Sequence, residues 1–310
     1  MEERKIVRAV APWNPFAGSG QVHFKTKPYN AWRAVGGSTC LSHTPARLLF
    51  GFFYHYGLPP VFRKKGEARL CFMEPVAMNF DAFPYYMGYE IIPFLWDVWP
   101  MYDDRVVRWL RKYHVRTCIV TCSQAVRRLR ERLPDVAFWY CPEGINTADY
   151  PGGKPLEERT IDFYTYGRLQ KNLYEWRREG ITMARGGDWS TLKRCLQDSK
   201  VVVALPQCDV LPERVGRQET LTQRFWECML SRMVMVGRAP KELVDLLGYN
   251  PVVDISYDNF PQQVADLVAH IAHYQPLVDR NRTAALRLGD WTERMRRVRT
   301  FLEGQDYEVP

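Results

Sequence analysis

The sequence is poor in cysteine and lacks any long hydrophobic run. Its 310 residues include 8 cysteines, which are too few and too dispersed for the disulfide framework of a small secreted domain. There is no CxxC pair, so the cysteine spacing does not favour a structural zinc site. No window approaches the ~20 apolar residues of a membrane-spanning helix, and the N-terminal MEERKIVRAVAP reaches polar and turn residues too early for a secretory signal. We therefore expect a cytoplasmic protein with reduced thiols.

The remaining composition is that of an ordinary globular protein. Hydrophobic residues make up 46% of the chain and charged residues 25%, which excludes a disordered chain and a collagen-like fibre. The length is sufficient for two domains, each with its own core.

Positive charge is concentrated in the first half of the chain. The net charge is +8, and residues 1–160 contain 22 basic and 15 acidic residues, so nearly all of the excess lies there. Between Arg105 and Arg132, nine basic residues accompany a single acidic one, and Trp109 and Tyr113 lie among them. Such a run is either a solvated helix surface or a surface for a membrane, a nucleic acid or a phosphorylated substrate.

Short apolar runs alternate with amphipathic stretches along the chain. This alternation predicts an α/β fold with parallel sheets that helices cover on both faces. The predicted strands are 6–11, 68–73, 90–96, 117–122, 161–166, 181–184, 200–206 and 233–237. The predicted helices are 103–112, 123–133, 169–179, 190–198, 221–232, 240–247 and 259–274. The turn-rich segment 141–155 is the best linker, which predicts two Rossmann-like domains with a cleft between them.

Candidate binding residues follow the predicted strands, because ligands of such sheets bind at the carboxyl ends of the strands. Gly167, Arg168 and Lys171 follow strand 161–166 at the start of a helix. A glycine permits a close turn, and a helix N-terminus with basic side chains favours an anion. The same spacing also fits ordinary basic residues at a helix end.

A second candidate lies in the helix predicted from about residue 221. Thr220 and Gln223 have the spacing of a capping box at its start. Glu227 lies two turns in, and a carboxylate can accept hydrogen bonds from two neighbouring hydroxyls. The alternative is a glutamate on a solvated helix surface.

Several of these signals occur in the order of one known family. Glu219 and Glu227, with seven residues between them, match the paired-glutamate motif of the group 1, family 4-like glycosyltransferases of the GT-B fold. Gly167-Arg168 with Lys171 resembles the glycine–arginine…lysine loop of that family. Further similar segments are PEGINTADY (142–150), SQA (123–125), GRAPKE (237–242) and the tryptophan of GDWTERMRRVRTFLE (289–303). The resemblance is best over about 117–303.

The resemblance implies a fold, a domain division and an activity. Residues 1–140 would form an acceptor-side domain, with 290–310 as a C-terminal helix that returns to it. Residues 141–289 would form the nucleotide-sugar-binding domain, facing the first across a cleft. The implied activity is transfer of a sugar from a nucleotide-diphosphate sugar to a saccharide or lipid-linked glycan.

The resemblance also implies roles for individual residues. Glu227 would bind the ribose hydroxyls. Arg168 and Lys171 would neutralise the diphosphate, with the Gly167 turn and the N–H groups near Thr222 and Gln223 assisting. No metal or other cofactor is expected, because fixed cations can stabilise the leaving group, and the chain has no Asp-x-Asp motif.

Two carboxylates are candidates for the chemistry. Glu219 would lie near the donor sugar, as in a retaining enzyme. An inverting enzyme needs a base on the acceptor side, and Asp97, at the end of strand 90–96, is the best candidate. The family's histidine before this aspartate is absent, since Trp96 stands in its place, and the glycine-rich stretch between the two glutamates is also missing.

Two other functions are compatible with the sequence: one keeps the donor-binding residues and changes the acceptor, and the other does not need a donor site. A phage-type glycosyltransferase that modifies DNA bases would use Trp109 and Tyr113 for stacking and the surrounding arginines for the DNA backbone. A nucleic-acid-binding module with a degenerate transferase fold would need no donor site. In the first interpretation, the basic half, including Arg127, Arg128 and Arg130, could contact an anionic acceptor or the anionic surface of a membrane.

Overall fold

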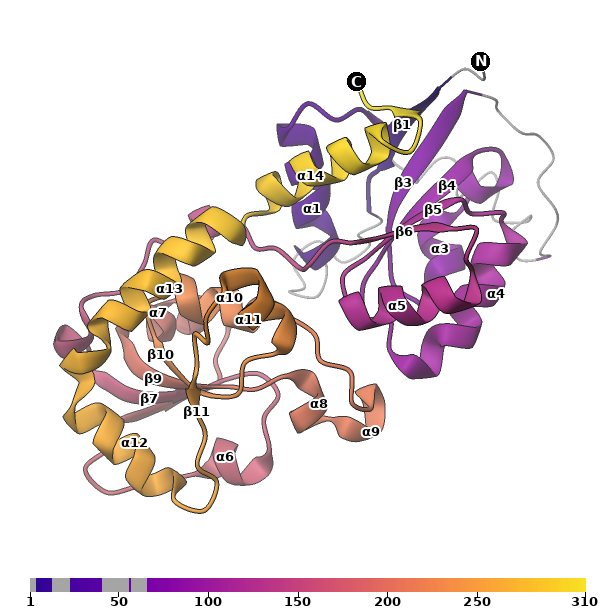
Figure 1. Cartoon of the computed structure of the whole chain (residues 1–310). Coiled ribbons are helices and arrows are strands. Elements are labelled where there is room, and N and C mark those ends of the chain that lie inside the picture. Colours follow the sequence, from indigo (N-terminus) through magenta and orange to yellow (C-terminus); the bar gives the residue numbers. More distant parts are fainter. Residues whose placement is uncertain (1–3, 13–22, 41–55, 57–65) are drawn as a thin grey trace. The chain divides into compact units, whose positions relative to one another are not determined.

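The computed structural model describes residues 4–12, 23–40, 56 and 66–310, and the chain divides into two compact units (Figure 1). The first unit consists of Met1–Pro142 with Trp291–Pro310, and the second of Glu143–Asp290. Among the described residues, no helix is both long and apolar enough to cross a membrane.

The first unit is built on one parallel sheet. Its strands are β1 (Lys5–Val10), β2 (Thr39–Cys40), β3 (Glu67–Met73), β4 (Glu90–Leu95), β5 (Thr117–Val120), β6 (Ala137–Tyr140) and β12 (Tyr307–Glu308). In the described part of the chain they pair in the order β12-β1-β3-β4-β5-β6, and β2 also pairs with β1. The helices are α1 (His23–Ala34), α3 (Met78–Ala82), α4 (Asp103–Lys112), α5 (Ser123–Arg132) and α14 (Trp291–Glu303), with short 3₁₀ turns at η2 (Tyr85–Met87) and η3 (Pro100–Tyr102).

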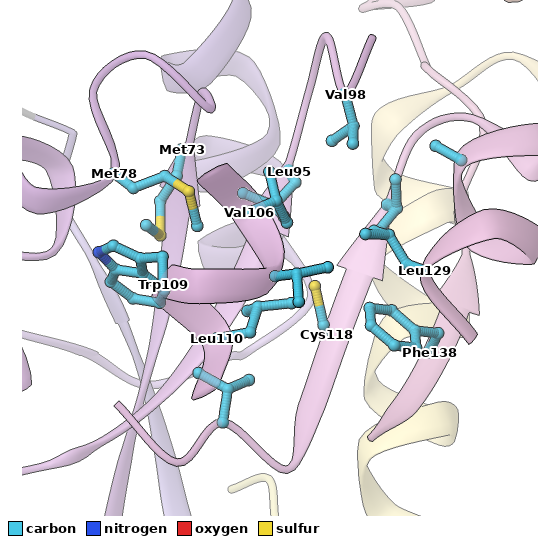
Figure 2. Close-up of a cluster of buried hydrophobic side chains, with 14 of the residues drawn as sticks. Met73, Met78, Leu95, Val98, Val106, Trp109, Leu110, Cys118, Leu129 and Phe138 are labelled. Atoms are coloured by element: carbon cyan, nitrogen blue, oxygen red, sulfur yellow. The ribbon is translucent and has the colours of Figure 1, made fainter. Parts of the chain in front are cut away.

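Helices cover both faces of this sheet (Figure 1). On one face, α3, α4 and α5 pack against alternate strand residues, as Figure 2 shows for Met73, Leu95 and Cys118 facing Val106 and Leu129. On the other face, α1 and α14 pack against the remaining strand residues. Since both faces are buried, the strands are almost continuously apolar, which is why short apolar runs identified them.

The C-terminal segment completes the first unit. Trp291, Met295, Val298 and Leu302 recur at helical spacing and are all buried on one side of α14. This side faces the sheet, and β12 then pairs in parallel with β1 at the edge, with Tyr307 opposite Lys5. The predicted return of the last helix to the first domain is therefore confirmed.

The second unit has the same architecture. Its strands are β7 (Ile161–Thr165), β8 (Met183–Arg185), β9 (Ser199–Ala204), β10 (Val234–Gly237) and β11 (Val253–Asp254), paired in parallel in the order β11-β10-β9-β7-β8 among the described residues. Its helices are α6 (Lys171–Glu175), α7 (Trp189–Asp198), α8 (Gln207–Val210), α9 (Pro212–Val215), α10 (Gln223–Leu230), α11 (Lys241–Leu247), α12 (Phe260–Ala269) and α13 (Gln275–Leu288), with 3₁₀ turns at η4 (Thr147–Asp149), η5 (Leu156–Glu158) and η6 (Ile271–Tyr274).

Two separate apolar layers hold this unit together. One joins the sheet to α7, α10, α11 and α13, and its centre is formed by Phe225, Trp226 and Met229 of α10. The other joins the opposite face to α6 and α12 through Leu173, Phe260 and Val264. The predicted α/β class with two Rossmann-like parts is confirmed.

Some predicted helix boundaries are wrong. The helix predicted at 169–179 is only Lys171–Glu175, and the one predicted at 259–274 ends at Ala269 and resumes as a 3₁₀ turn. The helix predicted from 221 begins at Gln223, with Thr222 as the N-cap. The capping box is also wrong, since the Thr220 hydroxyl lies 3.5 Å from the side-chain amide of Gln218 instead. The apolar pattern does not predict strands β2, β6, β11 and β12 or helices α1, α3, α8, α9 and α13.

One largely buried carboxylate connects three strands of the first unit with the residue that precedes a fourth. Glu90 on β4 accepts hydrogen bonds from Lys5 on β1, from the Tyr307 hydroxyl on β12 and, at 2.8 Å, from Arg116 at the start of β5. Burial alone would raise the pKa of Glu90, but the bonds from Arg116, Lys5 and Tyr307 outweigh it and hold the pKa below its ordinary value of 4.5. The ionised form therefore stabilises this edge of the sheet.

We expect Glu90→Gln to lower the free energy of unfolding at neutral pH by about 1–3 kcal/mol. Because the folded-state pKa is depressed, the wild-type advantage is fully present above pH 4.5 and is lost as the pH falls through the folded-state pKa. Urea unfolding of both proteins at neutral and acidic pH measures this. Glu308→Gln, an exposed glutamate on β12, is the control, and a Glu90→Gln effect equal to the control at every pH would contradict the prediction.

Candidate functional site

Several predicted site residues of the second unit lie at the carboxyl edge of its sheet. Neighbouring parallel strands end at the same edge, and here β8, β7, β9 and β10 lie side by side. Gly186 and Arg238 directly follow β8 and β10, whereas Gly167 and Pro206 come one residue later, after Tyr166 and Leu205 at the ends of β7 and β9. Gly186 and Gly167 have positive φ angles of 49° and 67°, which allows the chain to turn sharply after β8 and β7.

Gly167 admits an arginine from another element. A Cβ atom at this position would lie 2.1 Å from Nη2 of Arg224, so any side chain here would displace the guanidinium. Arg224 lies in the first turn of α10, donates a hydrogen bond of 3.2 Å to the carbonyl of Arg168, and lies 5.0 Å from the ring centre of Tyr166. The loop after β7 and the start of α10, where Thr222 and Gln223 lie, are therefore in direct contact.

The two basic residues predicted for the diphosphate are exposed. The side chain of Arg168 is exposed beside Gly167, and only its carbonyl is bonded to Arg224. Lys171 is the first residue of α6, with a side chain that is 84% exposed and 3.9 Å from the Glu175 carboxylate. Exposed cations next to a turn of positive φ are available to an anionic ligand.

Glu227 lies between two tyrosine hydroxyls. Its Oε1 accepts a hydrogen bond of 3.0 Å from Tyr150, and its Oε2 accepts one of 3.0 Å from Tyr166. Both tyrosines are buried, with exposures of 4% and 7%. Burial raises the pKa of both hydroxyls, and the charge of Glu227 raises it further, so the tyrosines remain protonated donors.

Glu219 lies in a different set of contacts. One oxygen pairs with Arg238, and the other accepts a hydrogen bond of 2.8 Å from the backbone N–H of Lys241 at the start of α11. Arg238 also makes two hydrogen bonds of 2.7 Å to Asp209 on α8. These bonds, with Asp209 contributing most, raise the pKa of Arg238. Glu219 thus connects the loop before α10 to β10 and α11.

The structure brings some of the predicted residues together and separates others. Gly167, Arg168, Thr222, Gln223 and Glu227 are linked through α10 and the end of β7. Lys171 and Glu219 have other partners.

Sequence reasoning missed the residues that make these links, namely Arg224, Tyr150 and Tyr166. Arg224 stands between the paired glutamates, Tyr166 directly precedes Gly167, and Tyr150 closes the PEGINTADY segment. Position within these motifs was the signal that could have found them.

Asp97 lies at the carboxyl edge of the first unit's sheet. It follows β4 with a φ of 50°, a left-handed conformation that costs a residue other than glycine about 1–3 kcal/mol. The turn is closed by a hydrogen bond of 2.8 Å from the Trp99 N–H to the Asp97 carbonyl. The neighbouring strand β3 ends beside it, since the Trp96 N–H bonds to the Met73 carbonyl. Sites of function are where such strain is commonly retained.

The aromatic residues of the basic region pack against other side chains of the first unit. Trp109 is 7% exposed, and its Nε1 donates a hydrogen bond of 2.8 Å to Asn79. Tyr113 packs against Trp109 and Tyr86, with ring centres 4.6 and 4.7 Å apart. The expectation that Trp109 and Tyr113 present a surface for DNA is therefore not supported, because Trp109 is buried and Tyr113, directly after α4, is half-buried against Trp109 and Tyr86.

Several basic residues of the same region have structural partners. Arg128 on α5 makes two hydrogen bonds to Asp103 on α4, of 2.6 and 3.1 Å, and Arg132 pairs with Asp104 at 2.7 Å. Arg130 donates to the Phe138 carbonyl. Arg127 is exposed on the same helix. The predicted basic surface for the acceptor is therefore smaller than expected, because Arg128, Arg130 and Arg132 join α5 to α4 and β6.

A cavity of about 480 Å³ lies elsewhere in the second unit. Its lining residues are Val253, Asn259, Gln263, Asp266, Leu267, His270, His273 and Tyr274. None of the predicted site residues lines it. Within the described ranges, no group of three or more His, Cys, Asp or Glu side chains is placed to hold a metal ion.

Comparison with known proteins identifies the fold. No family model and no curated protein matches the chain, but solved structures do. Sucrose-phosphate synthase from Thermosynechococcus elongatus matches with a TM-score of 0.59 and 11% identity over 97% of this chain and 99% of that one. HepE from Anabaena, solved with UDP, matches with a TM-score of 0.57 and 9% identity over 97% of this chain and 100% of HepE. An α-glucosyltransferase (AGT), also solved with UDP, matches with a TM-score of 0.56 and 9% identity over 97% of this chain and 100% of that one.

These similar structures are glycosyltransferases of the GT-B type. They cover both units of this chain, and each unit separately has the parallel sheet with helices on both faces that such a fold requires. The protein therefore has a GT-B fold, as the sequence resemblance implied. At these identities the similarity establishes the fold alone.

We expect Arg128→Glu to destabilise the first unit and Arg127→Glu to leave it nearly unchanged. The Arg128 change places a carboxylate beside Asp103, whose side chain is largely buried, and breaking such a pair costs about 2 kcal/mol or more. Chemical unfolding of the two variants and the wild type measures the difference. Equal effects would show that the pair with Asp103 contributes nothing and that this side of α5 is entirely solvated.

Proposed function

We propose that the protein is a glycosyltransferase that binds a nucleotide-diphosphate sugar at the carboxyl edge of its second unit. The observation that carries this is the contact between Gly167-Arg168, Arg224 and the Tyr150–Glu227–Tyr166 group. The exposed cations suit the diphosphate of a nucleoside diphosphate, and the fixed carboxylate suits its ribose hydroxyls. Proteins of similar fold along the whole chain were solved with UDP, which supports this donor class.

In this proposal each predicted residue has a defined part. Glu227 accepts hydrogen bonds from the ribose hydroxyls. Arg168 and Lys171 neutralise the diphosphate, and the backbone N–H groups near Thr222 and Gln223 add donors at the start of α10. Gly167 keeps the loop open for Arg224, which adds a further positive charge next to Arg168.

The proposed transfer needs no metal ion or other cofactor. The diphosphate gains negative charge as the glycosidic bond breaks, and fixed cations stabilise that charge in the transition state. The nucleotide sugar is a co-substrate. Glu219 would lie near the donor sugar, with its carboxylate oriented by Arg238 and the Lys241 N–H.

The proposed acceptor is a hydroxyl of a saccharide or a lipid-linked glycan. Asp97 would take the proton from this hydroxyl if the transfer inverts the anomeric centre. The remaining exposed charge of α5, such as Arg127, would face an anionic acceptor or the cytoplasmic surface of a membrane. A DNA acceptor is not favoured, because Trp109 is buried and Tyr113 is half-buried against it.

We expect Arg168→Ala and Lys171→Ala to weaken binding of a nucleoside diphosphate by about tenfold or more, while binding of the nucleoside changes little. A charge-assisted hydrogen bond to phosphate contributes about 1.5–3 kcal/mol, and the nucleoside lacks the phosphates. Calorimetric titration with the diphosphates and nucleosides of uridine, guanosine, adenosine and cytidine measures both affinities.

Arg287→Ala is the matched control, since Arg287 is an exposed arginine of α13 away from the sheet edge. Equal losses for nucleoside and diphosphate, or no loss for either variant, would remove Arg168 and Lys171 from the diphosphate site. Absence of binding to every diphosphate by the wild type would overturn the proposed function itself.

We expect Asp97→Asn to lower turnover by about 10²-fold or more without changing affinity for the donor nucleotide. The reason is that amide substitution removes the base but preserves the size of the side chain. Release of the nucleoside diphosphate from its sugar, in the presence of a panel of saccharide acceptors, measures turnover. Unchanged turnover would exclude Asp97 as the base and leave a retaining reaction that involves Glu219.

A further inference from the structure

The carboxylate of Glu227 has a specific arrangement of hydrogen bonds. A carboxylate has two oxygens with about four lone-pair positions in all. Tyr150 occupies one position on Oε1, and Tyr166 occupies one on Oε2, each at 3.0 Å. One acceptor position therefore remains for a ligand on each oxygen, and two vicinal hydroxyls need just such a pair.

The two tyrosines come from different parts of the second unit and are themselves held in place. Tyr166 directly follows β7, and its ring stacks on Tyr164 with centres 5.1 Å apart. Tyr150 follows η4 and meets the ring of Trp189 edge-on at 6.5 Å. Two fixed donors on opposite oxygens prevent rotation of the carboxylate about its last side-chain bond.

We propose that Tyr150 and Tyr166 are positioning residues that orient Glu227, so that its two oxygens each accept one of the vicinal ribose hydroxyls. The site then selects ribonucleotides over 2′-deoxyribonucleotides. This inference rests on the proposed function, since it concerns the same nucleotide site. The tyrosines act through Glu227 and need no contact with the ligand.

The tyrosine hydroxyls suit this task because each keeps its proton and donates it to the Glu227 carboxylate, which can only accept. The Tyr166 hydroxyl also lies 3.4 Å from Sγ of Cys228, whose thiol can donate to it. Burial and the adjacent charge raise their pKa, so neither hydroxyl loses its proton near neutral pH. If they were instead simple core residues, their rings alone would matter. Replacement by phenylalanine keeps the ring contacts with Tyr164 and Trp189 and removes only the hydroxyl.

The test compares ribose recognition in Tyr150→Phe, Tyr166→Phe and the wild type. Calorimetry first identifies which nucleoside diphosphate of the uridine, guanosine, adenosine and cytidine series binds, and then measures its 2′-deoxy form. The wild type should prefer the ribose form by about tenfold or more. Each variant should reduce this preference by about threefold or more, with the loss confined to the ribose form.

Tyr249→Phe is the matched control, because the Tyr249 hydroxyl also bonds to a side chain of the second unit, that of Asn281 at 2.9 Å. It should keep the wild-type preference. In a Glu227→Ala background, the two phenylalanine substitutions should have no further effect on the preference, because the tyrosines act only through that carboxylate.

The outcomes distinguish failure of the positioning role of the tyrosines from failure of the proposed function. If the wild type binds a diphosphate but Tyr150→Phe and Tyr166→Phe retain its ribose preference, the positioning role is overturned and the proposed function stands. The same holds if the wild type has no ribose preference. If the wild type binds none of the diphosphates, both the function and the positioning role are overturned.

Discussion

The candidate site residues of this protein lie beyond the strand ends because both sheets are parallel and buried on both faces. A buried sheet face accepts only apolar side chains without a large desolvation cost. Charged groups that must meet therefore do so where the backbone leaves the sheet. Arg168 and Arg238 lie in the loops after β7 and β10, and Asp209 lies on α8, which follows β9. Helix α10 supplies Arg224 and Glu227 to the same edge.

Within that edge, close packing decides which groups can be neighbours. Gly167 leaves room for the Arg224 guanidinium, and Gly237 lets β10 approach β9 so closely that a Cβ atom would lie 2.0 Å from the Ala204 carbonyl oxygen. Arg238, next to Gly237, then reaches both Asp209 and Glu219. In each case the absence of a side chain on the glycine leaves room for this packing, and a charged side chain, Arg224 or Arg238, is placed next to it.

Most of the longer helices and strands could be predicted from the apolar pattern of the sequence. The contacts between side chains that are distant in the sequence could not. Helix Asp103–Lys112 matches its prediction because its apolar spacing and acidic first turn agree. Short strands such as β12 carry too few residues to give a pattern. The site residues were predicted by their places after strands, but the pairing of Glu227 with Tyr150 joins residues 77 positions apart. Likewise, the burial of Trp109 depends on Asn79, which no local periodicity includes.

The return of the last helix makes the second unit an insertion within the first. Glu143–Asp290 is one continuous stretch, whereas the first unit is assembled from both ends of the chain. During synthesis, the second unit can fold as soon as it leaves the ribosome, since domains fold as units. Helix α14 and strand β12, which cover one face and the edge strand of the first unit's sheet, come after the second unit in the chain. The first unit therefore cannot be completed before the second has been synthesised.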